Sequence, residues 1–174
     1  MEKEALKRIF DFLEEKEQHN PPFIWKFKNN IPLIEDDLNV KGDLDLHHSN
    51  ITSLPEGLKV MGNLLLFGSA ITSLPKDLEV KGSLSLYETN ITSLPEGFKV
   101  GGALDLRNSD IERLPKGLKV GDELDLGFTN IKSLPEGLKV GGVLNIIESD
   151  LLKYSNKELK EMIKPGFIKG KIYR

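Results

Sequence analysis

Apolar and variable residues alternate along most of this chain in a pattern that repeats every 20 residues. Written as a template, the pattern is V-x-G-x-L-x-L-x-x-[S/T]-x-I-x-x-L-P-x-x-L-x, where x differs between copies. Six copies, called coils one to six, begin at Val40, Val60, Val80, Val100, Val120 and Val140. A fixed period of this length indicates a solenoid, in which each copy forms one coil that stacks on its neighbours.

Within each coil the pattern predicts one short strand and one returning segment. The alternation in V-x-G-x-L-x-L has the period of two that a strand with one buried face shows. The core side chains expected in coil one are Val40, Leu44, Leu46, Ile51, Leu54 and Leu58. The expected fold is therefore a solenoid, with a parallel β-sheet on one face and irregular or turn returns on the other.

Single-domain organisation is expected, with a cap at each end of the repeats. Residues 1–39 are predicted to hold a helical N-terminal cap and a degenerate first coil, and residues 40–150 the six repeats, the last of them diverging. Within the first region, residues 1–18 have the apolar spacing of an amphipathic helix. Phe23, Trp25 and Phe27 alternate as a strand would, in a coil whose register is ambiguous by one residue.

The C-terminal cap, residues 151–174, is expected to contain one helix and one strand. Ser155 and Glu158 have capping-box spacing, which predicts a short helix with Leu159 on its inner face. The segment from Ile168 to Ile172 then restarts the template and predicts one last strand of the sheet.

Three columns of small residues recur in the repeats. One glycine column comprises Gly42, Gly62, Gly82, Gly102 and Gly142, and the other comprises Gly57, Gly97, Gly117 and Gly137. The exceptions, Asp122 and Asp77, are both aspartate, which tolerates left-handed backbone, so positive φ is expected in both columns. The hydroxyl column comprises Ser49, Ser69, Thr89, Ser109, Thr129 and Ser149 and is expected to bond to the backbone where the coil bends.

Composition narrows the chemistry. The chain has no cysteine, three histidines and a net charge of −3, so neither a thiolate metal site nor a nucleic-acid-binding surface is indicated. Neither a secretory signal nor a membrane-spanning stretch is indicated, which favours a cytoplasmic protein. His47 and His48 would face opposite ways on a strand, and a stack of Asp105, Asp125 and Asn145 is expected to be a solvated face. We predict no catalytic residue, no metal site and no cofactor.

The variable strand positions are the best candidates for a working surface, because residues that differ between coils are free of the core. The eighth template position carries His47, Phe67, Tyr87, Arg107, Gly127 and Ile147. Large apolar, aromatic and Arg side chains at outward positions are what a protein interface needs. The predicted partner-binding residues are Met61, Leu65, Phe67, Tyr87, Arg107, Phe128 and Ile147. The Leu-Pro side of the coil is the alternative surface.

The motif L-x-L-x-x-[S/T]-x-I-x-x-L-P resembles the short leucine-rich repeats of bacterial and phage proteins. Leu44, Leu46, Ile51, Leu54 and Pro55 match that pattern, but Ser or Thr replaces the asparagine of the family. The resemblance implies a leucine-rich-repeat-like solenoid that serves as a non-enzymatic scaffold for a protein partner. Charge and hydropathy indicate neither a nucleic-acid nor a membrane partner, and the protein is expected to be a monomer or weak homo-oligomer. The alternatives are a phage- or bacteria-encoded inhibitor of a host enzyme or defence protein, and a self-associating structural or surface protein.

Overall fold

A computed structural model describes residues 23–174 of the 174-residue chain. The chain divides into two compact units, residues 1–37 and 38–174. The predicted amphipathic helix of residues 1–18 lies outside the described residues.

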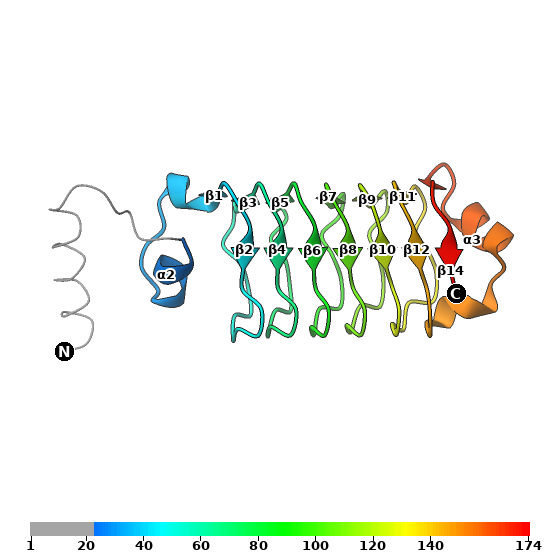
Figure 1. Cartoon of the computed structure of the whole chain (residues 1–174), viewed down its shortest axis with the longest axis horizontal. Coiled ribbons are helices and arrows are strands. Elements are labelled where there is room, and N and C mark those ends of the chain that lie inside the picture. The colour runs from blue at the N-terminus through cyan, green and yellow to red at the C-terminus, as the bar shows by residue number, and fades with distance from the viewer. Residues whose placement is uncertain (1–22) are drawn as a thin grey trace, which may run out of the picture. The chain divides into compact units, whose positions relative to one another are not determined.

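The larger unit is a β-solenoid of 20-residue coils whose strands, two residues each, form two all-parallel sheets. Sheet A contains β1 (Asn39–Val40), β3 (Lys59–Val60), β5 (Glu79–Val80), β7 (Lys99–Val100), β9 (Lys119–Val120), β11 (Lys139–Val140) and β13 (Phe167–Ile168). Sheet B contains β2 (Leu44–Asp45), β4 (Leu64–Leu65), β6 (Leu84–Ser85), β8 (Leu104–Asp105), β10 (Leu124–Asp125), β12 (Leu144–Asn145) and β14 (Ile172–Tyr173). Figure 1 shows the strands of sheet B side by side along the solenoid.

The predicted core positions are the buried ones, except that Val40 and Ile51 of coil one are only half-buried. Leu58, Leu64, Leu66 and Ile71 are fully buried, and their equivalents in the following coils are buried as well. Strand partners are 20 residues apart, so identical template positions stack on one another. The solenoid with parallel sheets is therefore confirmed, although the V-x-G-x-L stretch forms two strands with a bend between them instead of one.

The C-terminal cap is as predicted. Ser149 accepts a hydrogen bond at the start of the short 3-10 helix η2 (Asp150–Lys153), and α3 (Asn156–Met162) begins with the capping box of Ser155 and Glu158. The strands β13 and β14 then pair with β11 and β12, with Ile168 beside Val140. The tail thus completes one more coil after a helical insertion.

The strand predicted for Phe23, Trp25 and Phe27 is wrong, because Phe23–Lys28 forms the helix α2. One helical turn brings the rings of Phe23 and Phe27 into a stack with centroids 5.3 Å apart. Lys26, on the same side, is buried and its Nζ donates to Asp37 Oδ2 at 2.8 Å. Three alternating aromatics in five residues fit a helical i, i+4 pair as well as a strand.

The 3-10 helix η1 (Glu35–Leu38) follows, where the sequence predicted the returning half of a first coil. Ile34, aligned with the buried Leu54 of coil one, is 55% exposed. Among the described residues, the stack of strands begins only at β1.

The two glycine columns have different physical causes, so the single explanation by positive φ is wrong for one of them. Gly57, Gly97, Gly117 and Gly137 have φ between 66° and 76°, as predicted, but Asp77 does not have positive φ. The first column lacks positive φ, and its members from Gly62 onward instead lie close to the preceding coil, whereas Gly42 in coil one has open space around it. A Cβ on Gly102 would lie 2.6 Å from Ser83 Oγ and 3.0 Å from the carbonyl carbon of Gly82.

The hydroxyl column has the predicted structural role in five of its six members. The hydroxyls of Ser49, Thr89, Ser109, Thr129 and Ser149 each donate to the carbonyl oxygen three residues earlier, at 2.6 to 2.8 Å. The prediction is wrong for Ser69, whose buried hydroxyl has no hydrogen-bond partner. In the other five coils these bonds fix the bend that follows sheet B.

Candidate functional site

The eighth template position forms a continuous outward column along sheet B. The backbone places it, because the N–H of the ninth residue in one coil donates to the carbonyl of the eighth residue in the next. His48 N thus bonds to Phe67 O at 2.9 Å, and Glu88 N to Arg107 O at 3.1 Å. Side chains of the column therefore lie one strand spacing apart, about 4.8 Å, whatever their chemistry.

Adjacent members of this column stack in pairs. The rings of His47 and Phe67 are nearly parallel, with centroids 4.7 Å apart and an interplanar angle of 6°. In the next pair the Arg107 guanidinium lies 5.3 Å from the centroid of the Tyr87 ring, a cation–π geometry. The Tyr87 hydroxyl donates to Glu88 Oε1 at 2.6 Å, and this bond raises the pKa of the tyrosine. The pairing holds these side chains in fixed orientations.

The charge of Arg107 is compensated on its own face. Its Nε and Nη2 donate to the two carboxylate oxygens of Asp105 at 2.9 and 2.7 Å, and its Nε lies 3.5 Å from Asp125 Oδ2. The hydrogen bonds to Asp105 raise the pKa of Arg107 above its ordinary value, against the opposing effect of burial. The guanidinium is therefore a fixed, neutralised platform and is poorly suited to capture another anion.

The stack of Asp105, Asp125 and Asn145 was predicted to be solvated, and this is wrong for Asp125, which is only 9% exposed. Its carboxylate accepts from Gly127 N at 2.9 Å and from Asn145 Nδ2 at 3.0 Å. Because Gly127 has no side chain, space is left beside the Asp125 carboxylate. The Arg107 side chain, from the preceding coil, occupies this space. Burial and the nearby carboxylates, Asp125 foremost, raise the pKa of Glu123 beside this cluster.

Phe128 follows Gly127 in sequence and combines two unfavourable features, an exposed aromatic ring and left-handed backbone. It is 60% exposed and has a φ of 57°. A hollow of about 320 Å³ lies beside it, lined by Phe128 together with Tyr87, Arg107 and Asn108. A bulky residue in left-handed backbone is strained, and such strain clusters at functional sites.

The left-handed conformation recurs at the ninth position of every coil. The residues there are His48, Gly68, Glu88, Asn108, Phe128 and Glu148, with φ between 47° and 61°. Sequence reasoning missed this column. The signal available was the presence of Gly68 and Asn108, the two residue types most tolerant of positive φ, at the same template position.

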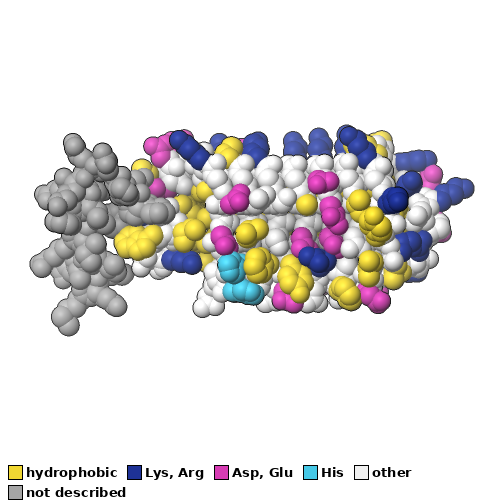
Figure 2. All heavy atoms as spheres, in the orientation of Figure 1, with side chains coloured by type: hydrophobic (Ala, Val, Ile, Leu, Met, Phe, Trp, Pro, Cys, Tyr) yellow, Lys and Arg dark blue, Asp and Glu magenta, His cyan; other side chains and the backbone are white. Residues whose placement is uncertain are grey.

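The predicted partner-binding residues do not all lie on one sheet. Leu65 in β4 points outward and is half-buried, as are Phe67 and Tyr87 further along sheet B, while Ile147 is 38% exposed at the end of the column. Met61 is 42% exposed but follows β3 in sheet A. The structure thus separates Met61 from the group it was predicted to join. Figure 2 shows hydrophobic, histidine and charged side chains mixed along the face that carries sheet B.

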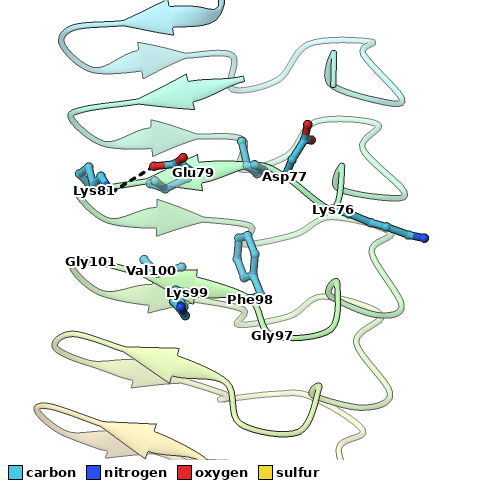
Figure 3. Close-up of a pocket in the computed structure, with 11 residues that line it drawn as sticks. Lys76, Asp77, Glu79, Lys81, Gly97, Phe98, Lys99, Val100 and Gly101 are labelled. Carbon is cyan, nitrogen blue, oxygen red and sulfur yellow. Dashed lines mark ion pairs between the residues drawn. The ribbon is translucent and has the colours of Figure 1, made fainter. Parts of the chain in front are cut away.

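A second hollow, of about 510 Å³, lies on sheet A between coils three and four (Figure 3). Phe98 lines this hollow and occupies a template position that holds leucine in the other coils. Beside it, β5 pairs with β7 only through Val80 and Val100. On its rim, Lys81 Nζ lies 3.1 Å from Glu79 Oε2, and this pairing lowers the pKa of Glu79, whereas Lys76 and Lys99 form no ion pair with a described residue. The hollow therefore combines one neutralised pair with separate lysines, and it holds no group of His, Asp and Glu side chains that could bind a metal ion.

The sequence matches no family model and no curated protein. In the described part of the chain, no three His, Asp or Glu side chains are grouped so that they could hold a metal ion. None of the helices between residues 23 and 174 is long and apolar enough to cross a membrane.

Proposed function

We propose that this protein is a non-enzymatic, cytoplasmic binding scaffold that recognises a protein partner through the outward side chains of sheet B. The β-solenoid fold is compatible with such a scaffold. The motif L-x-L-x-x-[S/T]-x-I-x-x-L-P supports membership of the short leucine-rich repeats of bacterial and phage proteins, whose members serve mainly in protein recognition.

The observation that carries the proposal is Phe128. Left-handed backbone costs a bulky L-residue roughly 1–2 kcal/mol, and exposure of its ring gains nothing for the core. Asn108 has the same conformation one coil earlier with a residue type that tolerates it. An exposed aromatic that is kept despite this cost is typical of an interface anchor, and aromatic and Arg anchors contribute most of the energy of many interfaces.

The neighbouring side chains support the same interpretation. The pairs His47–Phe67 and Tyr87–Arg107 are already oriented by stacking, so a partner would lose little side-chain entropy on ordering them. Because Asp105 neutralises Arg107, the hollow beside Phe128 fits an apolar or aromatic side chain better than a carboxylate.

The test compares partner capture by immobilised wild-type protein and by Tyr87→Ala/Phe128→Asn, with quantitative mass spectrometry as the readout. We expect the double variant to lose the partner that the wild type captures. The matched control is Leu152→Ala/Phe167→Ala, which removes two exposed apolar side chains from outside sheet B. Equal capture by all three proteins would move the site to the Leu-Pro side or to the caps.

The same experiment distinguishes the two alternative functions, inhibition of an enzyme or defence protein and self-association. A captured enzyme or defence protein whose activity falls on binding would make this scaffold an inhibitor. Capture of the chain by itself, with sedimentation that depends on concentration, would instead indicate self-association through the same face.

A further inference from the structure

A row of lysines crosses the outer surface of sheet A. Lys99, Lys119 and Lys139 occupy the same template position on β7, β9 and β11 and are direct register partners. Lys169 follows β13 on the next coil, where its N–H donates to Val140 O at 3.0 Å. These four side chains are called the lysine row. Figure 2 shows Lys and Arg side chains gathered along the edge of the solenoid that sheet A forms.

The row is not balanced by acidic side chains. No ion pair of the described residues involves any of its four lysines, whereas the one acidic residue in the same column, Glu79, is paired with Lys81 and Lys59. Like charges directly opposite one another on neighbouring strands are destabilising. In the folded protein no acidic side chain of the described residues relieves the repulsion between these lysines. This lack of an acidic partner points to an external anion.

Basic charge is also concentrated toward the same end of the chain. Residues 151–174 hold seven of the 24 Lys and Arg residues but only two of the 27 Asp and Glu residues. The net charge of −3 for the whole chain hides this asymmetry, which is typical of a surface that meets nucleic acid or membrane.

The surface around the row is bare. The positions beside the lysines are Gly101, Gly121 and Gly141, and a Cβ on any of them would overlap a carbonyl oxygen of the preceding coil. Of the four lysines, only Lys99 lines the hollow on sheet A. At the end of the row, Phe167 is 42% exposed, with Lys139 Nζ and Lys169 Nζ at 6.0 and 5.7 Å from its ring centroid. One exposed apolar ring thus lies among the ammonium groups.

We propose that the lysine row, with Phe167, binds reversibly to the anionic headgroups of a lipid surface. This inference is independent of the protein-binding face on sheet B. Each lysine presents a compact ammonium charge on a flexible side chain, which suits a fluid array of anionic headgroups. A membrane surface can contact the ammonium groups of all four lysines at once. Phe167 is placed to enter the headgroup boundary.

Two other anionic partners fit this surface less well. A nucleic acid would be met by arginine forks, hydroxyl or amide donors and several stacking rings, but the row has no arginine and a single aromatic. Lysine is depleted in protein interfaces, which argues against an acidic protein surface.

The test measures co-sedimentation of the full chain with vesicles of phosphatidylcholine alone and of phosphatidylcholine mixed with phosphatidylserine. We expect binding only to the anionic vesicles, and weaker binding as salt is raised. A lysine near an anionic surface contributes roughly five-fold to the partition coefficient, so Lys99→Gln/Lys119→Gln/Lys139→Gln should lower it about 100-fold. Phe167→Ala should lower it several-fold without removing the salt dependence.

The matched control removes the same charge from outside both sheet A and residues 151–174, with Lys28→Gln/Lys116→Gln/Lys132→Gln. The control should lose far less binding than the row variant, and circular dichroism should show both variants folded, since all six side chains lie outside the core. Equal losses in the two triple variants, or no binding to anionic vesicles, would overturn the proposal. Tighter binding of a single-stranded or duplex oligonucleotide at the same salt, lost in the row variant, would overturn it in favour of nucleic acid.

Discussion

Replacing Asn108 with valine tests the strain of the ninth position at a site with few other contacts. Asn108 has a φ of 52°, is exposed, and its one side-chain bond is a 3.4 Å contact to Glu88 Oε1. Left-handed backbone costs an ordinary L-residue roughly 1–2 kcal/mol, and a β-branched residue tolerates it worst. The valine variant should therefore lose about 1–2 kcal/mol in the free energy of unfolding. Asn108→Gly should stay within about 0.5 kcal/mol, because freedom from strain is offset by a more flexible unfolded chain.

Urea titration and thermal melting followed by circular dichroism measure this difference. For a chain of this length, each kcal/mol lowers the melting temperature by roughly 2–4 °C, so the valine variant should melt about 2–8 °C lower. The control is the same pair of substitutions at Asn130, an exposed residue without positive φ. If valine and glycine differ by the same amount at both positions, backbone strain at the ninth position is not the cause. That result would also refute the argument that left-handed backbone strains Phe128.

Three further predictions follow from the packing and the charges. Gly102→Ala should destabilise by roughly 1–3 kcal/mol because its Cβ would lie 2.6 Å from Ser83 Oγ, whereas Gly97→Asn, in open left-handed backbone, should change the urea midpoint little. Burial and neighbouring carboxylates raise the pKa of Glu123, so its ionised form penalises the fold, and stability due to this group falls as pH rises through that pKa. Glu123→Gln should therefore raise the melting temperature at pH 7 but not well below pH 4.5, and a constant difference would contradict this. Deletion of residues 155–174 should leave the outer edges of β11 and β12 without a partner strand and cause aggregation visible by light scattering, and a monomer with an unchanged melt would contradict this.

The repeated frame was predictable because each position of the template is sampled six times. Leucine at the fifth position has one role in every coil, as the buried Leu64 illustrates. The hydroxyl at the tenth position has one role in every coil but the second, as the Thr89 bond to Leu86 O illustrates. A pattern that arises by chance in one short segment rarely recurs in six copies, so a repeated pattern predicts secondary structure more reliably. Phe23–Lys28 had no second copy, and there the alternation of aromatics predicted a strand where a helix forms.

The glycine columns show where repetition does not help. Glycine meets two different requirements, positive φ at Gly97 and close approach of the backbone at Gly102, with the same letter in the sequence. The aspartates that interrupt the columns did not resolve the two, since Asp77 takes a conformation without positive φ. Only the position of the preceding coil separates these causes, and that position is a property of the stack.

The candidate site depends on the stack in the same way. Asp125 is buried because Gly127, two residues later, lacks a side chain, and because Arg107, from the preceding coil, extends over the gap. A Cβ on Gly127 would lie 3.2 Å from Asp125 Oδ1 and 3.3 Å from Ile147 O, so a side chain at this position would require both neighbours to shift slightly. Backbone hydrogen bonds hold the column in register regardless of side chain, which frees its residues to vary. Contact between coils then couples neighbouring residues of this column, so we expect the effects of substitutions in adjacent coils of the proposed binding face to be non-additive.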